Sequence, residues 1–305
     1  MAAEEKKKER YGEKGVNIYR TIADYKSYLS ELRSAPGGSA VTIGFVPTMG
    51  YLHAGHLSLA AEAKAAADVA VASIFVNPLQ FGPAEDFERY PRDEERDLSL
   101  LKQAGVDAVF IPDVKEMYPA PIRTTVAVSQ VSERLCGASR PGHFDGVATV
   151  VMKLFHIIEP AMAFFGLKDA QQVAVIEQMV ADLNMSVKIV PCPTIREADG
   201  LAMSSRNVYL SEEERRQAPI LFRALQSIDG WLSADREMTA AQLEQKMKAF
   251  IAEAPLAIID YTEVLTYPDM QPVPGKLREA GPFIAALAVK FGNTRLIDNR
   301  CFHIC

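Results

Sequence analysis

The sequence predicts an α/β protein: a Rossmann-like, doubly wound parallel sheet followed by a second, smaller α+β domain. Up to about residue 193, short apolar runs alternate with segments of helical periodicity, as expected for a parallel sheet covered on both faces. Beyond that point two helical segments precede three strand-like runs, an order typical of α+β units. Because 305 residues exceed one ordinary domain, we expect a first domain over 16–193 and a second over 194–305.

Each element of the first domain has a local signal. Thr21 is placed to cap a helix with Asp24 in its first turn, and Gly105 ends another helix. Between 147 and 158 apolar residues recur at i, i+3, i+4 and i+7, which predicts a helix facing the core. The expected strands are 16–19, 41–46, 69–75, 108–111, 161–165 and 187–190. The expected helices are 21–34, 55–67, 92–104, 147–158 and 168–181.

The second domain is expected to follow a linker near residues 190–200. Two segments with helical periodicity come first, and they precede three runs whose pattern suits antiparallel strands. The expected helices are 211–232 and 239–254, and the expected strands are 258–265, 283–291 and 294–297.

The charge balance argues against a nucleic-acid partner. Lys and Arg number 33 against 39 Asp and Glu, a net charge of −6, whereas binding to a phosphate backbone needs a basic surface. No apolar run approaches the ~18 residues of a membrane span, so we expect no membrane partner. The highly charged segment 1–15 lacks the apolar core of a secretory signal, and we expect a disordered tail on a cytoplasmic protein.

The four cysteines are expected to be reduced thiols in a cytoplasmic chain. Cys136 and Cys192 lie far apart in the sequence, and Cys301 and Cys305 lie at its C-terminus. With His303, the last two offer a possible metal site. Three ligands at a chain end nevertheless make a poor structural zinc site, so we do not expect one.

The first chemical motif is PTMGYLHAGH, residues 47–56, which follows an apolar strand and opens a helix. Helix N-terminal amides and the positive end of the helix dipole attract phosphate at such a position. His53 and His56 can face one side of the first turn and donate hydrogen bonds to phosphoryl oxygens, and Gly55 allows a ligand close to the backbone. Spacing alone equally allows two capping or surface histidines, and a zinc site would lack a third ligand.

The second motif is GLKDAQQ, residues 166–172, which again follows an apolar strand and opens a helix. Lys168 and Gln172 are i, i+4 neighbours on one face. Lysine suits a phosphate, and Asp169 suits ribose hydroxyls. Taken alone, a Lys/Asp pair on a solvated helix explains the segment better.

The third motif is LAMSSRN, residues 201–207, which follows an Asp-Gly turn. Two hydroxyls and a guanidinium in one loop can grip a polyphosphate, the arginine acting as a bidentate fork. A polar loop between domains is an equally good interpretation of this segment alone.

Taken together and in order, the motifs resemble those of the pantoate–β-alanine ligase (pantothenate synthetase) family. The resemblance runs from about residue 16 to 299. It also includes SIFVNPLQFGPAEDFERYPR, RPGHFDGVATVVMKLF and READG. The first and third motifs resemble the HIGH and KMSKS signatures of the nucleotidyltransferase superfamily.

This resemblance implies a reaction in two steps. The carboxylate of pantoate attacks the α-phosphorus of ATP, bound with Mg²⁺, to give pantoyl adenylate and pyrophosphate. β-Alanine then attacks the acyl carbon to give pantothenate and AMP. The resemblance also implies a homodimer joined through the first domain, and it leaves the metal ligands undetermined.

The resemblance assigns roles by position. The implied catalytic residues are His53, His56, Lys168 and Arg206, with His53 the usual catalytic residue and His56 its phosphate partner. The implied ATP-binding residues are Met49, Gly50, Tyr51, Leu52, His53, Ala54, Gly55, His56, Gly166, Leu167, Lys168, Asp169, Ile195, Met203, Ser204, Ser205 and Arg206. The implied pantoate residues are Gln80 and Gln172, with Asn77 lining their pocket. Neutral amides there suit a substrate whose carboxylate must remain nucleophilic.

The sequence departs from the family pattern in places. Ala54 replaces a frequent glutamate, Ala170 a common tyrosine, and Ala202 the first lysine of a KMSKS pattern, which leaves the cationic work to Lys168 and Arg206. One alternative is a nucleotidyltransferase that acts on a phosphate acceptor, although such proteins are usually shorter and lack the paired glutamines. Another is a nucleotide-binding regulator without catalysis. The presence of His53, His56, Lys168 and Arg206 together argues against it.

Overall fold

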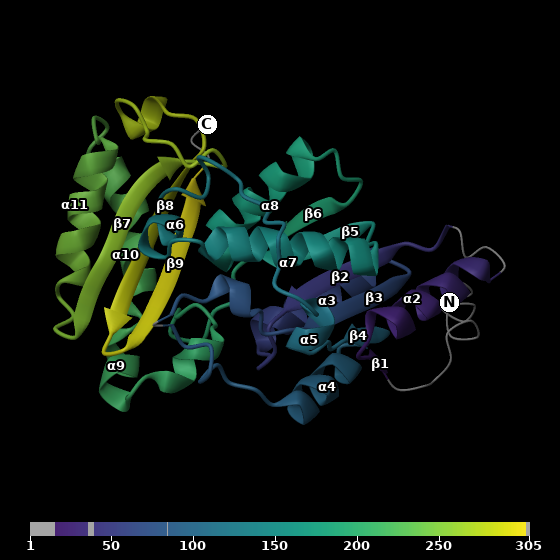
Figure 1. The fold of residues 1–305 in the computed structure, drawn as a ribbon. Helices are drawn as coiled ribbons and strands as arrows, with labels where there is room; N and C mark the ends of the chain where they lie inside the picture. The colour runs from purple at the N-terminus through teal and green to yellow at the C-terminus, as the bar shows by residue number, and fades with distance from the viewer. Residues whose placement is uncertain (1–15, 36–39, 84, 303–305) are drawn as a thin grey trace, which may run out of the picture.

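The computed structural model describes residues 16–35, 40–83 and 85–302, and Figure 1 shows two sheets lying side by side with their helices. The larger sheet has six parallel strands in the order β1-β4-β3-β2-β5-β6. This confirms the predicted doubly wound α/β class. Its strands are β1 (Asn17–Tyr19), β2 (Ile43–Thr48), β3 (Val69–Ile74), β4 (Ala108–Phe110), β5 (Met162–Gly166) and β6 (Lys188–Cys192).

The strand order reverses between β2 and β5. The chain runs from β2 through β3 and β4 on one side, and from β5 to β6 on the other. Such a switch point opens a crevice at the carboxyl ends of the strands, where α/β proteins bind ligands. Because β2 ends at Thr48 and β5 at Gly166, the first and second motifs both begin at this crevice.

Alternating side chains of the central strands build a core on each face of the large sheet. Phe45 and Val71 belong to one core, and their neighbours Val46 and Ala72 belong to the other. The first core is covered by α2 (Ile22–Ser34), α7 (His143–Ile158) and α8 (Ala170–Asp182). The second is covered by α3 (Ala54–Ala66) and α4 (Glu94–Gln103). The short helices α5 (Val114–Met117) and α6 (Cys136–Ser139) lie in the connection before α7.

The C-terminal domain is a three-stranded antiparallel sheet, as the predicted α+β class requires. Along β8, side chains at odd positions pack with helices of this domain, whereas Ile284 and Ala286 pack into the core of the first domain. The sheet therefore presents one face to its own helices and the other toward the crevice. Its elements are β7 (Ala257–Thr266), β8 (Phe283–Phe291), β9 (Thr294–Phe302), α9 (Glu212–Gln217), α10 (Ile220–Ala234) and α11 (Ala240–Ile251).

Two predicted elements of this domain were wrong in extent. The expected helix 211–232 is divided into α9 and α10 around Pro219, which has no N–H to continue the helical hydrogen bonds. The expected strand 294–297 continues as β9 to Phe302, because it pairs with β8 over the whole length of that strand. In the first domain, the helix expected at 147–158 begins at His143.

Some sequence predictions concern residues outside the described part of the chain: the tail 1–15, His303 and Cys305. The described cysteines Cys136, Cys192 and Cys301 are free. Within the described residues, no helix has both the length and the apolar character that crossing a membrane requires.

We expect Gly146→Ala, in the first turns of α7, to lower the free energy of unfolding. In an ordinary helix this change stabilises, but here the new Cβ would lie 2.2 Å from the backbone oxygen of Leu79. The forced shift should cost about 1–3 kcal/mol, measured by urea unfolding.

The matched control is Gly230→Ala in α10, where no atom lies within 4 Å of the added Cβ. That change should stabilise by about 0.5–1 kcal/mol. Equal effects of the two substitutions would contradict the packing of α7 on residues 78–80.

Candidate active site

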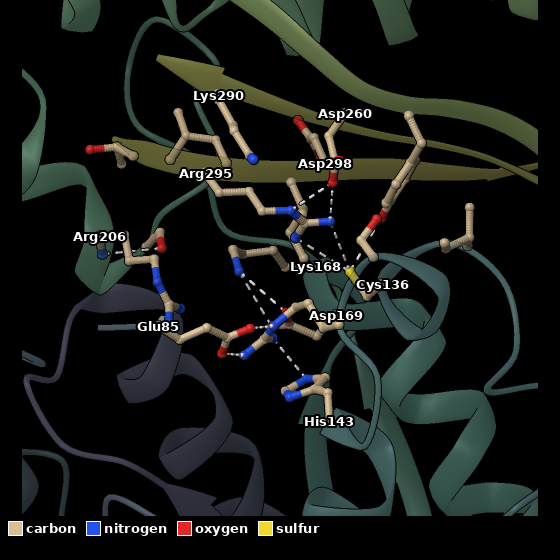
Figure 2. Close-up of a pocket in the computed structure, with 18 of the residues that line it drawn as sticks. Glu85, Cys136, His143, Lys168, Asp169, Arg206, Asp260, Lys290, Arg295 and Asp298 are labelled. Atoms are coloured by element: carbon tan, nitrogen blue, oxygen red, sulfur yellow. Dashed lines mark hydrogen bonds and ion pairs between the residues drawn. The ribbon is translucent and has the colours of Figure 1, made fainter. Parts of the chain in front are cut away.

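Two adjoining cavities of about 980 and 230 Å³ lie around the switch point of the large sheet. The larger one also reaches the C-terminal sheet. In Figure 2 the side chains of Lys168 and Asp169 lie between Arg295 and Asp298 of β9 and the imidazole of His143. The residues that line both cavities are Arg140, His143, Lys168, Asp169, Gln172, Ser204 and Arg206.

Two imidazoles cap the N-terminus of α3, where backbone N–H groups have no helical partner. His53 Nδ1 accepts from the Gly55 N–H at 3.2 Å, and His56 Nδ1 accepts from the His53 N–H at 3.3 Å. The ring centroids lie 4.1 Å apart. A Cβ on residue 55 would come within 2.9 Å of the His53 ring. Glycine is therefore needed there to seat the imidazole, beyond the ligand access expected from the sequence.

The cap determines which nitrogen of each ring remains as a hydrogen-bond donor. Because both Nδ1 atoms accept hydrogen bonds, a neutral ring carries its proton on Nε2. Burial, with the nearby positive charge of Lys168, lowers the pKa of His53 to about 4. Burial and the neighbouring His53 lower the pKa of His56 well below its ordinary value. At neutral pH the two histidines are therefore uncharged Nε2–H donors.

Asp97 of α4 holds the loop that precedes these histidines. Its buried carboxylate accepts from the N–H groups of Tyr51 at 2.6 Å and Leu52 at 2.7 Å. Tyr51 has a φ of 50°, in the left-handed region, and these two bonds hold it there. The Leu52 side chain is fully buried in the core, so the loop is anchored immediately before His53.

Gln80 is held by a chain of hydrogen bonds on the other side of the smaller cavity. Its Nε2 donates to Met49 Sδ at 3.1 Å, and its Oε1 accepts from Asn77 Nδ2 at 3.2 Å. Asn77 Nδ2 also donates to the Gly146 carbonyl at 3.1 Å, and its Oδ1 accepts from the Tyr118 hydroxyl at 2.8 Å. Asn77 was expected to line the pocket; it does, but at 1% exposure its main contribution is to position Gln80.

Arg140, which follows α6, and His143, the first residue of α7, hold the short helix η2 (Pro78–Gln80) in place. The Gln80 carbonyl accepts from His143 Nδ1 at 2.8 Å and from Arg140 Nη2 at 3.2 Å. Arg140 also donates to His143 Nε2 at 2.9 Å and grips the Glu85 carboxylate at 2.7 and 2.5 Å. Burial and the Arg140 charge lower the pKa of His143 to about 4, so this imidazole is neutral.

The second motif forms η3 (Leu167–Asp169), which brings Lys168 to the cavity. Its Nζ lies 3.4 Å from both carboxylate oxygens of Asp169. Gln172 follows in the first turn of α8 and lines the same cavities, as its spacing from Lys168 predicted. The motif thus places one cation and one neutral amide beside the histidines.

The third motif contributes Ser204 and η4 (Ser205–Tyr209) from the C-terminal side of the cavity. Ser205 Oγ donates to the Tyr51 carbonyl at 3.2 Å and so joins this loop to the histidine loop. The resemblance implies that Arg206 contacts the phosphates. In this structure its Nε and Nη2 donate to the Asp86 carboxylate at 3.0 and 2.9 Å, since a half-buried guanidinium needs acceptors.

Most of the residues singled out from the sequence converge on the smaller cavity. The exceptions among them, which line neither cavity, are Gly50, Tyr51, Leu52, Ala54 and Leu167. The residues that do line it are Met49, His53, Gly55, His56, Asn77, Gln80, Gly166, Lys168, Asp169, Gln172, Ile195, Met203, Ser204, Ser205 and Arg206.

Sequence reasoning missed three residues that hold this site together: Asp97, Arg140 and His143. The motif RPGHFDG contains two of them, but nothing in its spacing indicates that they contact Gln80. Asp97 carried no local signal beyond its place in a charged helix.

The described residues contain no group of three or more His, Cys, Asp or Glu side chains arranged to hold a metal ion.

Comparison with known proteins decides the family. The family model described as pantoate-beta-alanine ligase matches residues 17–301. The chain belongs to the pantoate–β-alanine ligase family. It is 54% identical over 282 residues to the pantothenate synthetase of Pelotomaculum thermopropionicum, covering 92% of this chain and 97% of that one. The pantothenate synthetase of Caldicellulosiruptor saccharolyticus is 55% identical over 258 residues, covering 85% and 90%.

Solved structures of this family share the fold. The pantothenate synthetase of Thermus thermophilus superimposes with a TM-score of 0.85 at 43% identity, covering 93% of this chain and 99% of that one. A Francisella tularensis pantoate-beta-alanine ligase, described as complexed with beta-gamma ATP and beta-alanine, gives a TM-score of 0.76 at 34% identity, covering 94% and 97%. The chain is thus an enzyme that ligates pantoate and β-alanine to pantothenate, which sets aside both alternatives raised from the sequence.

We expect the free energy of unfolding to fall as pH is lowered from about 6.5 to about 4. In the fold His53 and His143 have a pKa of about 4, against an ordinary value of 6.5. Between these values the unfolded chain binds more protons, so acidification favours unfolding, by up to about 1.4 kcal/mol per pKa unit of difference. Urea unfolding across this range measures the slope.

His143→Gln should flatten this slope, whereas His156→Gln, at an exposed position, should leave it unchanged. Identical slopes for wild type and both variants would contradict the burial of the site histidines as neutral rings.

Proposed function

We propose that this ligase uses ATP to form pantoyl adenylate and then transfers the pantoyl group to β-alanine. The observation that carries the proposal is the pair of neutral imidazoles at the N-terminus of α3, with Lys168 close enough to lower the pKa of His53. Two N–H donors, a helix N-terminus and one cation suit an α-phosphoryl group whose charge increases during attack.

In the proposed first step, a carboxylate oxygen of pantoate bonds to the α-phosphorus and the bond to the β-phosphate oxygen breaks, releasing pyrophosphate. His53 and His56 donate to the α-phosphoryl oxygens, and Lys168 balances the charge of the leaving group. In the second step the unprotonated amine of β-alanine attacks the acyl carbon and AMP leaves. The amine loses one proton as the amide forms.

Gln80 and Gln172 are proposed to bind pantoate. Both line the smaller cavity together with the histidines, and Gln80 is fixed by Asn77 and Met49. Amides bond the hydroxyl groups without neutralising the carboxylate that must attack. Charged side chains in the same places would pair with that carboxylate and reduce its nucleophilicity.

ATP is proposed to lie along the three motifs, from the Ile195 backbone at the adenine side to Ser204 and Arg206 at the phosphates. A relative with 34% identity is described as complexed with beta-gamma ATP and beta-alanine, which supports both ligands here. Mg²⁺ would be held mainly by phosphate oxygens, with Asp169 the carboxylate beside Lys168. When bound, the ion would neutralise the charge that develops on pyrophosphate.

The C-terminal domain, residues 194–305, is proposed to act as a lid on the first domain, residues 16–193. Arg206 on one side is bonded to Asp86 on the other, and Ser205 to Tyr51. Phosphate oxygens could replace Asp86 as the acceptor for Arg206 once ATP is bound. A closed lid would also protect the adenylate from water.

The family resemblance further supports a homodimer, joined through the first domain, in the cytoplasm. Sedimentation of the purified protein tests the first of these.

We expect exchange of labelled pyrophosphate into ATP to require pantoate but not β-alanine, because adenylation precedes the arrival of the amine. The measurement is exchange with each substrate omitted in turn. Exchange that needs β-alanine would contradict an adenylate intermediate.

We expect His53→Ala to lower the single-turnover rate of adenylation by ~10²–10³-fold, the range for removing one transition-state donor. His156→Ala, an exposed histidine on α7, is the matched control and should adenylate at the wild-type rate. A wild-type adenylation rate in His53→Ala would show that His53 acts only as a helix cap, which contradicts the proposed role.

We expect Arg206→Ala to slow adenylation and to expose the adenylate to hydrolysis. The measurement is AMP released per adenylate formed, with pantoate and ATP present and β-alanine absent. An unchanged ratio with slower ATP use would make Arg206 a phosphate ligand only and would contradict the lid.

A further inference from the structure

Two consecutive residues of β9, Asp298 and Asn299, contact two different segments beside the cavities: the hairpin of residues 196–202 and η3. Asn299 Nδ2 donates to the carbonyls of Leu167 at 2.9 Å and Lys168 at 2.8 Å. Asp298 receives both Nη atoms of Arg196, at 2.6 and 2.9 Å. Successive side chains of a strand point to opposite faces, so one short stretch of strand reaches both loops.

The Asn299 contact fixes the backbone from which Lys168 projects. Leu167 and Lys168 belong to η3, a single turn of 3₁₀-helix between β5 and α8. Both carbonyls bonded by Asn299 lie in this turn, and the donor comes from the C-terminal domain. The position of the Lys168 side chain therefore depends on β9 as well as on the large parallel sheet.

The Asp298 contact fixes the loop that leads to Ser204 and Arg206. Arg196 also donates to the Gly200 carbonyl at 3.1 Å, and its guanidinium carbon lies 4.2 Å from the centre of the Phe222 ring. A backbone bridge between Arg196 and Ala202 closes this hairpin at the start of the third motif, two residues before Ser204. With Asp298 almost fully buried, the hairpin cannot shift without separating a buried ion pair.

We propose that Asp298 and Asn299 form a positioning pair that sets the distance between Lys168 and the Ser204–Arg206 loop. Neither side chain is placed in the chemistry. A triphosphate held by both loops binds well only when their separation matches its length, because groups misplaced by about 1 Å lose much of their effect. The pair acts on ATP and leaves the pantoate site around Gln80 and Gln172 unchanged. This inference rests on the proposed use of ATP.

The experiment compares Asn299→Leu, which keeps the side-chain size without a donor, with wild type. We expect Kd for a non-hydrolysable β,γ-methylene ATP, measured by calorimetry, to rise about tenfold for the loss of two hydrogen bonds. KM for ATP should rise with it, while KM for pantoate changes less than about twofold. Asn299→Gln, which retains an amide donor, should restore part of the affinity.

The matched control is Arg300→Leu, the next residue on β9, whose ion pair with Asp229 lies at the surface. It should bind the analogue as wild type does. If Asn299→Leu does not fold, Arg196→Lys gives the same test. Lysine keeps a positive charge opposite Asp298 but lacks the forked guanidinium that also donates to the Gly200 carbonyl.

The proposal is overturned if folded Asn299→Leu or Arg196→Lys binds the analogue with wild-type Kd. It is also overturned if KM for pantoate and ATP rise together, which would indicate general loosening of the fold. Failure of the proposed function has a separate signature: wild type itself would neither bind the analogue nor release pyrophosphate with pantoate.

Discussion

The unpaired amides at the N-terminus of α3 impose the constraint on which the site depends. A helix start leaves N–H groups that need acceptors, and here the acceptors are the Nδ1 atoms of His53 and His56. That use of Nδ1 leaves Nε2–H as the group available to a ligand. Burial then keeps both rings uncharged at neutral pH. The local cap thus sets the tautomer and orientation, and burial sets the charge, of the two residues proposed to contact the α-phosphate.

Other parts of the molecule keep this cap in place and fix the residues around it. Asp97 fixes the loop before the histidines, and the Arg140–His143 brace fixes Gln80 across the cavity. The C-terminal sheet holds both η3 and the hairpin that leads into the third motif through adjacent residues of β9. The site is therefore distributed over both domains, and its geometry depends on contacts that the chain makes only after folding.

The sequence was informative where the signal is local. Apolar runs such as 69–75, followed by helical periodicity, predicted the parallel sheet, and the strand-to-helix position of His53 and His56 predicted their place at its carboxyl edge. Pro219 at the junction of α9 and α10 is a local signal for the break between them, but the helical periodicity on both sides favoured one continuous helix. The C-terminal half of β9 has no such local signal, because its last residues gain strand structure by pairing with β8.

Residues that act through distant partners could not be found in this way. Asp97 lies 45 residues from the Leu52 amide that it accepts from, and Asn299 lies 131 residues from Lys168. Arg206 illustrates the converse: its type and loop predicted a phosphate ligand, while its partner here, Asp86, depends on how two domains meet. Charge and spacing indicate what a side chain can bind, and only the fold determines what it contacts.

The central claim is that the helix cap holds His53 and His56 as neutral Nε2–H rings, and imidazole nitrogen NMR at pH 7 tests it most directly. In ¹⁵N-histidine-labelled enzyme, assigned by comparison with single substitutions, the account predicts protonated Nε2 and unprotonated Nδ1 for both residues. It also predicts that neither ring becomes charged until the pH falls well below the ordinary histidine pKa of 6.5. Rings protonated on both nitrogens at pH 7, or carrying the proton on Nδ1, would contradict it.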